Sequence, residues 1–335
     1  MSFMGFTSFT RKLSSTFFIL IIALSVAVFS LYIPPVDNSY ITATFLEFRA
    51  TGNIPHFHSG VDFSTFLKEG VPVKAVENGY LVRLEIDKGG IYGMTVVLEH
   101  QDGNRTLYAH LSKFSEKVDN ILSMLSAEFG EQRIVVEFSS DDIKFSKGEI
   151  IGYSGKTGEA SIAHAHFEVR NKDEKVVYNP LQFIDKSLLR PVEMKVLLKS
   201  IIIDDTEYPF SNGATYNFSG PYPRISVEAY TELAKNLLGV KEIKMYFSNN
   251  LVYNIKLDEL PMELWEQPFE IYHSKSIMTS IAYRGFYKLF SDKSFPFIKV
   301  NELSKHSDNN YSVRLEILDD FGNIGTFYFN VQRKL

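Results

Sequence analysis

The chain has 335 residues, of which 45% are hydrophobic and 22% are charged, and its net charge is −5. These values are typical of globular proteins and exclude a disordered chain or a polytopic membrane protein. The negative charge and the scattered Lys and Arg residues argue against a nucleic-acid partner. Because the sequence contains no cysteine, a cysteine nucleophile, a thiolate-bound zinc site and disulfide bonds are excluded.

Residues 1–35 are predicted to be a targeting segment. Arg11 and Lys12 precede an uncharged apolar run from Phe17 to Ile33, which ends at Pro34 and Pro35. A run of this length fits either a cleaved signal peptide or an uncleaved membrane anchor. We therefore expect an exported protein of the periplasm or cell envelope, which meets a membrane only through this segment.

Residues 36–188 are predicted to form a first domain of short strands separated by glycines. Residues 71–76 and 80–84 suggest one hairpin, turning at Glu77-Asn78-Gly79, and residues 94–99 and 105–111 suggest another, turning at Asp102-Gly103. Between residues 112 and 147, apolar residues recur with helical spacing instead. We therefore expect an antiparallel β-sheet with a small helical insert, whose apolar positions are Val118, Ile121, Leu122, Leu125 and Phe129.

Residues 189–335 are predicted to form a second domain, and no chemistry is assigned to it. Alternating apolar and polar residues predict six strands and a β-sandwich of immunoglobulin-like type. Residues 275–290 are predicted to be helical and to interrupt this pattern. The fold class is therefore mainly β, with the second set of strands at residues 192–203, 224–231, 241–247, 251–257, 311–318 and 325–331.

Six of the eight histidines lie between residues 56 and 166. Strict alternation in residues 162–170 places His164 and His166 on one face of a strand, with Ala165 pointing away. The same reasoning places Tyr108 and His110 on one face. His58 and Asp62 are four positions apart, which also puts them on one face. Two imidazoles and one carboxylate would hold zinc and leave a fourth position for water, as hydrolytic zinc requires.

Five motifs occur in an order that resembles a known family. They are the HxGxD segment from His58 to Asp62, the strand-turn Val73-Lys74-Ala75 with Gly79, the YxHL segment from Tyr108 to Leu111, a glycine turn at residues 147–158, and the HxH pair at residues 164–166. Over roughly residues 45–184 the chain resembles the LytM/lysostaphin-type zinc endopeptidases of peptidoglycan, peptidase family M23. The helical insert and the C-terminal β-domain further resemble a subgroup found in Gram-negative envelopes.

The resemblance implies a role for each motif residue. Zinc would be held by His58, Asp62 and His166, while His110 and His164 would orient the attacking water and stabilise the developing oxyanion. The residues do not decide which of these two histidines removes the proton. Where the family commonly has Gly-Pro-His-Leu-His, this chain has Ile162-Ala163-His164-Ala165-His166, a departure that is expected to affect substrate fit and to leave the ligands in place.

Other residues near the motifs are assigned supporting roles. Glu168 lies on the predicted strand face of His166 and is expected to accept a hydrogen bond from an imidazole N–H. His56 is expected to line the pocket or support a ligand, with competition for the metal as the alternative. The remaining histidines, His100, His273 and His306, are expected to be structural.

The sequence therefore predicts a zinc endopeptidase that hydrolyses the peptide cross-links of peptidoglycan. One alternative is a non-catalytic module of the same fold that binds peptidoglycan or activates a partner hydrolase. Another alternative is an exported zinc peptidase that acts on proteins.

Overall fold

The structure is a computed structural model that describes residues 31–50, 54–87, 89–129, 133–139, 142–279 and 283–334. Most of the predicted targeting segment therefore lies outside the described residues. In the described part of the chain, no helix is long and apolar enough to cross a membrane. Residues from Leu31 onward form one compact unit, in which Tyr32 is already buried and its N–H donates to the Phe183 carbonyl over 2.9 Å.

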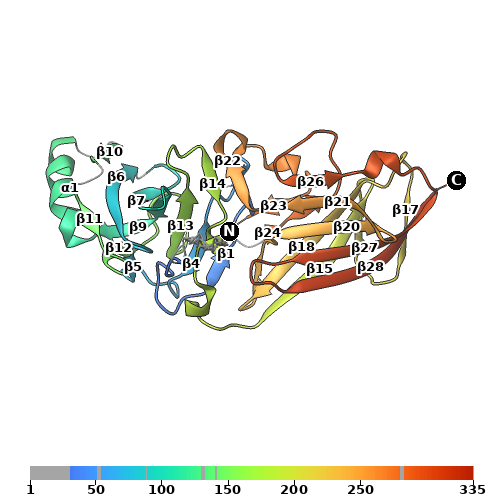
Figure 1. Cartoon of the computed structure of the whole chain (residues 1–335), viewed down its shortest axis with the longest axis horizontal. Coiled ribbons are helices and arrows are strands. Elements are labelled where there is room, and N and C mark those ends of the chain that lie inside the picture. The colour runs from blue at the N-terminus through green and yellow to red at the C-terminus, as the bar shows by residue number, and fades with distance from the viewer. Residues whose placement is uncertain are drawn as a thin grey trace, which may run out of the picture. The chain divides into compact units, whose positions relative to one another are not determined.

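The largest sheet has ten strands and is antiparallel throughout (Figure 1). Its main path runs β1-β4-β13-β8-β7-β6-β10, with β11 beside β6, and β14 joining β13 to β22. The predicted hairpin at Asp102-Gly103 is confirmed, since it connects β7 to β8. The ten strands are β1 (Ile41–Ala43), β4 (Val61–Ser64), β6 (Gly79–Asp87), β7 (Gly93–His100), β8 (Arg105–Ala109), β10 (Ile134–Glu137), β11 (Lys144–Phe145), β13 (His164–Arg170), β14 (Val176–Tyr178) and β22 (Glu259–Pro261).

The other predicted hairpin of this region is wrong. Strand β5 (Pro72–Lys74) does not pair with β6 but lies in a three-stranded sheet beside β12 (Ile150–Ser154), which also pairs with β9 (Leu111–Phe114). The backbone after β5 is bonded elsewhere, because the Val76 N–H donates to the Tyr108 hydroxyl over 3.0 Å. The turn at residues 77–79 therefore carries the chain from one sheet into another.

The predicted helical insert is confirmed as α1 (Glu116–Phe129). Its first turn forms bonds from the N–H groups of Val118 and Asp119 to the Ser115 carbonyl, each 3.0 Å long. The Val118 side chain is fully buried and anchors the helix. A separate two-stranded pair, β2 (Phe48–Arg49) and β3 (His56–Phe57), lies next in the chain to the predicted HxGxD segment.

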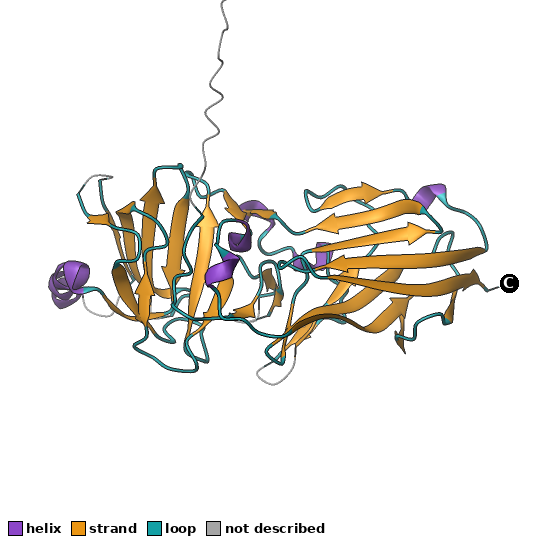
Figure 2. Cartoon of the chain, turned by 60° about the horizontal axis from the view of Figure 1, so that its bottom comes forward, coloured by secondary structure: helices purple, strands orange, loops and turns teal. Residues whose placement is uncertain are grey.

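The six strands predicted after residue 189 are all present, and they belong to two sheets (Figure 2). One sheet has five strands and the other has six, and β17 runs parallel to β28 while the remaining pairs are antiparallel. The mainly β fold class is therefore confirmed, and the immunoglobulin-like arrangement stays a prediction. The strands are β15 (Met194–Ile203), β16 (Thr206–Pro209), β18 (Ile225–Leu233), β19 (Asn236–Leu238) and β25 (Phe286–Lys288) in the first sheet, and β17 (Thr215–Phe218), β20 (Glu242–Phe247), β21 (Asn250–Lys256), β26 (Ile298–Asn301), β27 (Asn310–Leu318) and β28 (Ile324–Arg333) in the second.

The helix predicted at residues 275–290 is wrong. The described residues of this segment form β23 (Ile277–Met278) and β24 (Tyr283–Arg284), which pair with each other, and β25, which joins β18. The His273 N–H donates to the Phe286 carbonyl over 2.8 Å, so the chain folds back on itself. The apolar residues that suggested helical spacing are instead the β-branched and aromatic residues that favour strands. The described helices besides α1 are short 3-10 turns at Pro180–Gln182, Lys186–Leu188, Met262–Leu264, Pro268–Glu270 and Leu303–Lys305.

Contacts cross the domain boundary that the sequence suggested at residue 188. Strand β14 pairs with β22, so that Val177 lies opposite Leu260. The Asn179 side-chain amide donates to Asp320 Oδ1 over 2.8 Å. A single apolar core contains both Phe167 of β13 and Leu315 of β27. The C-terminal strands are therefore packed onto the first sheet.

Replacing Asp320 by Asn is expected to stabilise the protein at neutral pH. Burial raises the pKa of Asp320 to about 6, against the opposing effects of Asn179 and Lys241. Because the folded pKa lies above the unfolded value, the stabilisation from the protonated form is complete only below about pH 4 and is lost as the pH rises through about 6. Asp320→Asn should therefore gain roughly 2 kcal/mol at pH 8 and much less at pH 4. Urea denaturation at both pH values measures this, and an equal gain at the two would contradict it.

Candidate metal centre

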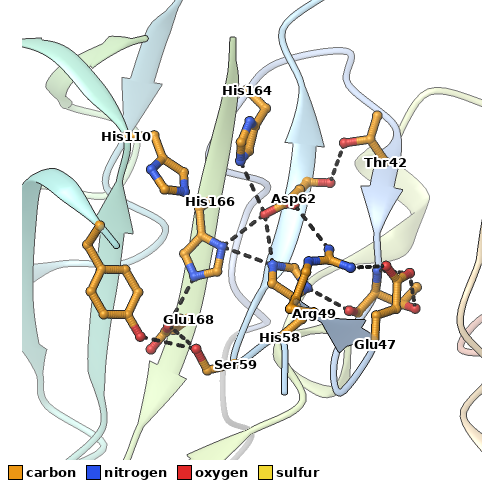
Figure 3. A network of polar contacts seen from close by, with 12 residues as sticks. Thr42, Glu47, Arg49, His58, Ser59, Asp62, His110, His164, His166 and Glu168 are labelled. Atoms are coloured by element: carbon orange, nitrogen blue, oxygen red, sulfur yellow. Dashed lines mark hydrogen bonds and ion pairs between the residues drawn. The ribbon is translucent and has the colours of Figure 1, made fainter. Parts of the chain in front are cut away.

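Two neighbouring strands and the loop before them place three side chains around one point (Figure 3). His166 of β13 lies directly opposite Asp62 of β4 in the sheet register, and His58 precedes β4. His58 Nε2 lies 3.1 Å from Asp62 Oδ1 and 3.1 Å from His166 Nδ1, and His166 Nδ1 lies 2.9 Å from Asp62 Oδ1. The three ligands implied by the resemblance are thus brought together; both histidines are buried, and Asp62 is 9% exposed.

The arrangement of these atoms fits zinc. Tetrahedral ligands at 2.0–2.1 Å from zinc are about 3.3 Å from one another, so only small movements would be needed. The outer ring nitrogens have other partners: His58 Nδ1 donates to the Thr44 carbonyl over 2.7 Å, and His166 Nε2 donates to Glu168 Oε1 over 3.0 Å. These bonds leave the inner nitrogen of each imidazole facing the shared point. Burial opposes protonation of His166, but the hydrogen bonds to Asp62 and Glu168 raise the pKa of His166 to about 9, so a metal would displace a proton from that ring. Burial also lowers the pKa of His58, which favours the neutral form that binds metal.

His110 and His164 lie beside this trio, with their ring centres 4.8 Å apart. His110 Nδ1 donates to the Thr157 carbonyl over 2.9 Å, and His164 Nδ1 donates to the Ile162 carbonyl over 2.8 Å. The Nε2 atom of each ring is therefore the one left for the cavity, and His164 Nε2 lies 3.6 Å from Asp62 Oδ1. Burial, together with the neighbouring imidazoles of His164 and His166, lowers the pKa of His110 to about 3. His110 is accordingly a neutral imidazole.

The prediction that Tyr108 and His110 share a strand face is wrong. Tyr108 pairs with Phe167 in the register and packs against its ring in the core, on the face opposite to His166. Unbroken alternation would put His110 in the core as well. Instead, His110 has a φ of 58°, in the left-handed region, and β8 ends at Ala109. This one backbone conformation turns the His110 side chain towards the site.

Glu168 makes the imidazole contact that the sequence predicted. Its Oε1 accepts hydrogen bonds from His166 over 3.0 Å and from Ser59 over 2.7 Å, and its Oε2 accepts from Arg170 Nε over 2.6 Å. Burial opposes ionisation, but Arg170 and His166 together hold the pKa of Glu168 well below its usual value. A fully buried anion therefore fixes the orientation of His166.

The cavity at the centre includes residues that the sequence analysis did not single out. Arg49 lines it, donates to Glu47 Oε2 over 2.8 Å, and lies 3.7 Å from Asp62 Oδ2. Tyr92, Trp265 and Met278 also line the cavity, and nothing in the local sequence marks the last two.

The histidines outside the five-residue set follow their predicted supporting roles. His56 lines the cavity, and its ring lies 4.4 Å from the Trp265 ring. His100 bonds to the Asn78 carbonyl and to the Thr106 hydroxyl within the first sheet. His273 Nε2 lies 3.2 Å from Asp205 Oδ1, and the His306 ring packs on Phe247. Ala165 is buried in the core and points away from the site, as expected.

Gly60→Ala is expected to destabilise the chain and disturb the centre. A Cβ at this position would lie 2.5 Å from the Phe167 carbonyl oxygen and 2.7 Å from the His166 ring. Overpacking of this kind costs typically about 1–3 kcal/mol. Urea denaturation and zinc titration measure the two effects. The matched control is Gly89→Ala, whose Cβ would meet no atom within 4 Å; equal losses in both variants would contradict the prediction.

Comparison with known proteins finds that the part of the chain around this site is similar to one peptidase family. Residues 56–123 match the model of peptidase family M23. DD-carboxypeptidase/endopeptidase Mpg of Neisseria meningitidis is 32% identical over 124 residues, which cover 37% of this chain and 22% of that protein. Lysostaphin of Staphylococcus simulans is 29% identical over 129 residues, which cover 38% of this chain and 21% of that protein. Stage II sporulation protein Q of Bacillus subtilis is 32% identical over 129 residues, which cover 38% and 36% of the two chains.

Similar solved structures include the catalytic domain of lysostaphin from Staphylococcus simulans, with a TM-score of 0.31 and 27% identity over 44% of this chain and 92% of that one. Another is the SpoIIQ–SpoIIIAH pore-forming complex, with a TM-score of 0.36 and 25% identity over 47% and 93%.

The resemblance to LytM/lysostaphin-type peptidases of family M23 is confirmed by these matches. The similarity concerns one part of each protein, since the chain spans about a fifth of the length of Mpg and of lysostaphin. His164 and His166 lie beyond the segment that the family model matches. Their place at the centre comes from the sheet register, which sets His166 opposite Asp62.

Proposed function

We propose that this chain is a zinc-dependent endopeptidase that hydrolyses the peptide cross-links of peptidoglycan in the cell envelope. The observation that carries the proposal is the convergence of five side chains on one cavity, with every outward ring nitrogen donating to a fixed acceptor. Zinc would be held by His58, Asp62 and His166, and export would depend on the N-terminal segment. The relatives named Mpg and lysostaphin support the substrate class.

The unliganded histidines supply the proton chemistry. When bound, zinc would lower the pKa of a water molecule and polarise the scissile carbonyl. The Nε2 atoms of His110 and His164 face the same cavity, so one of these imidazoles can accept the proton of the attacking water and then deliver it to the leaving amine, while the other holds the water in position. The bonds to Thr157 and Ile162 prevent either ring from turning away.

The presence of every motif residue favours an enzyme over a non-catalytic module of the same fold. A binding module would not require two unliganded imidazoles whose rings are fixed 4.8 Å apart beside the metal ligands. Hydrolysis does require such groups, because the nucleophile must lose a proton and the amine must gain one. We therefore place hydrolysis ahead of binding.

The test uses residues 31–335, which form one compact unit. Metal content is measured by mass spectrometry, and purified peptidoglycan is digested with the zinc-loaded protein, with chelator, and with zinc restored. We expect about one zinc per chain, release of cross-link fragments, loss with chelator and recovery with zinc. A parallel digestion of an unfolded protein substrate addresses the protein-peptidase alternative. Stoichiometric zinc without cleavage of either substrate would favour the binding module.

A further inference from the structure

The C-terminal region forms one wall of the metal cavity. Trp265 and Met278 line the same cavity as the three proposed metal ligands. Trp265 is held in place by a 3.0 Å hydrogen bond from the Phe57 N–H to its carbonyl and by the His56 ring, whose centre lies 4.4 Å from that of the indole. Strand β23, which ends at Met278, lies against β2. This wall therefore contacts β2 and β3, the two strands that precede the HxGxD segment.

Glu159 brings a carboxylate to the same cavity. Its backbone N–H donates to the Ile91 carbonyl over 3.1 Å, which fixes the base of the side chain. Its Oε2 is shielded from solvent and has no hydrogen-bond partner among the described residues. A shielded carboxylate oxygen without a donor is costly and calls for a polar or cationic group. Burial lowers the pKa of His56, and the nearby Glu159 carboxylate opposes this effect only weakly.

Among the described residues, no Lys or Arg side chain forms an ion pair with Glu159. Arg49 is the only Lys or Arg among the described residues that line the cavity, and its guanidinium is paired with Glu47 over 2.8 Å. Glu47 is itself fixed by the Gly239 N–H of the C-terminal region over 2.9 Å. Apolar side chains that line the cavity besides Trp265 include Phe57, Ile91 and Met278. The cavity thus combines an aromatic face, an aliphatic surface and one unpaired anion.

We propose that Trp265, Met278 and Glu159 form a specificity subsite for a lysine-like side chain of the peptide substrate. The alkyl stem would lie along the indole and the thioether, since long cationic side chains bury their stems on apolar surface. The ammonium would pair with Glu159 and would also be attracted by the indole ring. This proposal rests on the proposed function in one respect, namely that a peptide substrate binds in this cavity.

Trp265 makes direct measurement of this subsite feasible, because it is the single tryptophan of the chain. Residues 31–335 carrying His164→Ala are titrated with the peptide Ala-Lys-D-Ala and with its Nε-acetyl-lysine twin while tryptophan fluorescence is recorded. We expect a saturable change for both and an affinity at least about tenfold higher for the free amine. Met278→Ala should weaken both peptides, since it removes surface that the stem contacts.

Glu159→Gln in the same background should remove the preference for the free amine and leave the acetylated peptide unaffected. The matched control is Glu266→Gln, which removes the same charge from an exposed residue beside Trp265 that does not line the cavity. Equal affinities for the two peptides in the parent chain, or an unchanged preference in Glu159→Gln, would overturn the proposal. Preferential binding of the free amine by a chain that never cleaves peptidoglycan would support this subsite and reject the proposed function. Zinc-dependent cleavage without a preference for the free amine would support the proposed function and reject this subsite.

Discussion

His164→Ala is expected to keep its zinc and to lose at least about a hundredfold in the rate of cross-link hydrolysis, the usual scale for a general acid or base. The reason is that His164 Nε2 faces the cavity without belonging to the trio of close contacts, and its Nδ1 is committed to the Ile162 carbonyl. Removing the ring therefore leaves the three ligand atoms in place. Steady-state kinetics on a defined stem-peptide dimer, with zinc content measured on the same samples, tests this.

The partner variant is His166→Ala, which should lose zinc and activity together. His166 Nδ1 is one of the three converging atoms, 3.1 Å from His58 Nε2 and 2.9 Å from Asp62 Oδ1. A His164→Ala protein that retains full turnover would remove the catalytic role, and one that loses zinc would move His164 into the ligand set. His100→Ala offers a control, because this ring bonds to Asn78 and Thr106 away from the cavity.

Strand periodicity predicted the centre of the site well, because the pleat of a strand alone makes side chains alternate between its two faces. This alternation does not depend on residues far away in the sequence. His164, His166, Glu168 and Arg170 share one face of β13, while Ala165 is buried in the core on the other. The β7–β8 hairpin was predictable for a similar reason, since Asp-Gly favours a tight turn between strands. Local rules therefore succeed where an element is regular.

The same rules failed where the backbone leaves regular geometry or where pairing is distant. The positive φ of His110 reverses the direction of its side chain, and no neighbouring residue signals it. Strand β5 pairs with β12, more than seventy residues away in sequence, instead of β6 across the turn. Which strands pair depends on the packing of the whole core, and residues 277–288 were misassigned for that reason.

Trp265 lies at the metal cavity because of long-range packing alone. Residue 265 follows β22, which extends the first sheet beside β14, and this pairing brings the loop to His56 and Phe57. Tyr272 strengthens the contact through a 2.9 Å hydrogen bond to the Leu46 carbonyl. The C-terminal region is consequently part of the site, and a change in its packing should alter the cavity.

Glu168→Ala is expected to destabilise the fold by about 3–5 kcal/mol, because it leaves Arg170 as a buried cation that has lost its nearest carboxylate. Arg170 would keep the 2.9 Å contact with Glu174 and a 3.1 Å hydrogen bond to the Tyr92 hydroxyl, and His166 Nε2 would lose its acceptor. Loss of such an orienting partner typically costs 10–100-fold in metal affinity, and we expect the same here, about tenfold or more.

Two measurements separate the effects of Glu168 on folding and on the metal. Urea denaturation with chelator reports the fold alone, and competition with a zinc chelator under native conditions reports the affinity. Glu99→Ala is the matched control, since it also removes a carboxylate that pairs with an arginine, Arg105 over 2.9 Å, but at a solvated site where ion pairs contribute at most about 1 kcal/mol. If Glu168→Ala changed stability no more than Glu99→Ala, the buried anion would not be the element that holds His166 and Arg170. If stability fell while zinc affinity stayed unchanged, Glu168 would act on the sheet and not on the orientation of the imidazole.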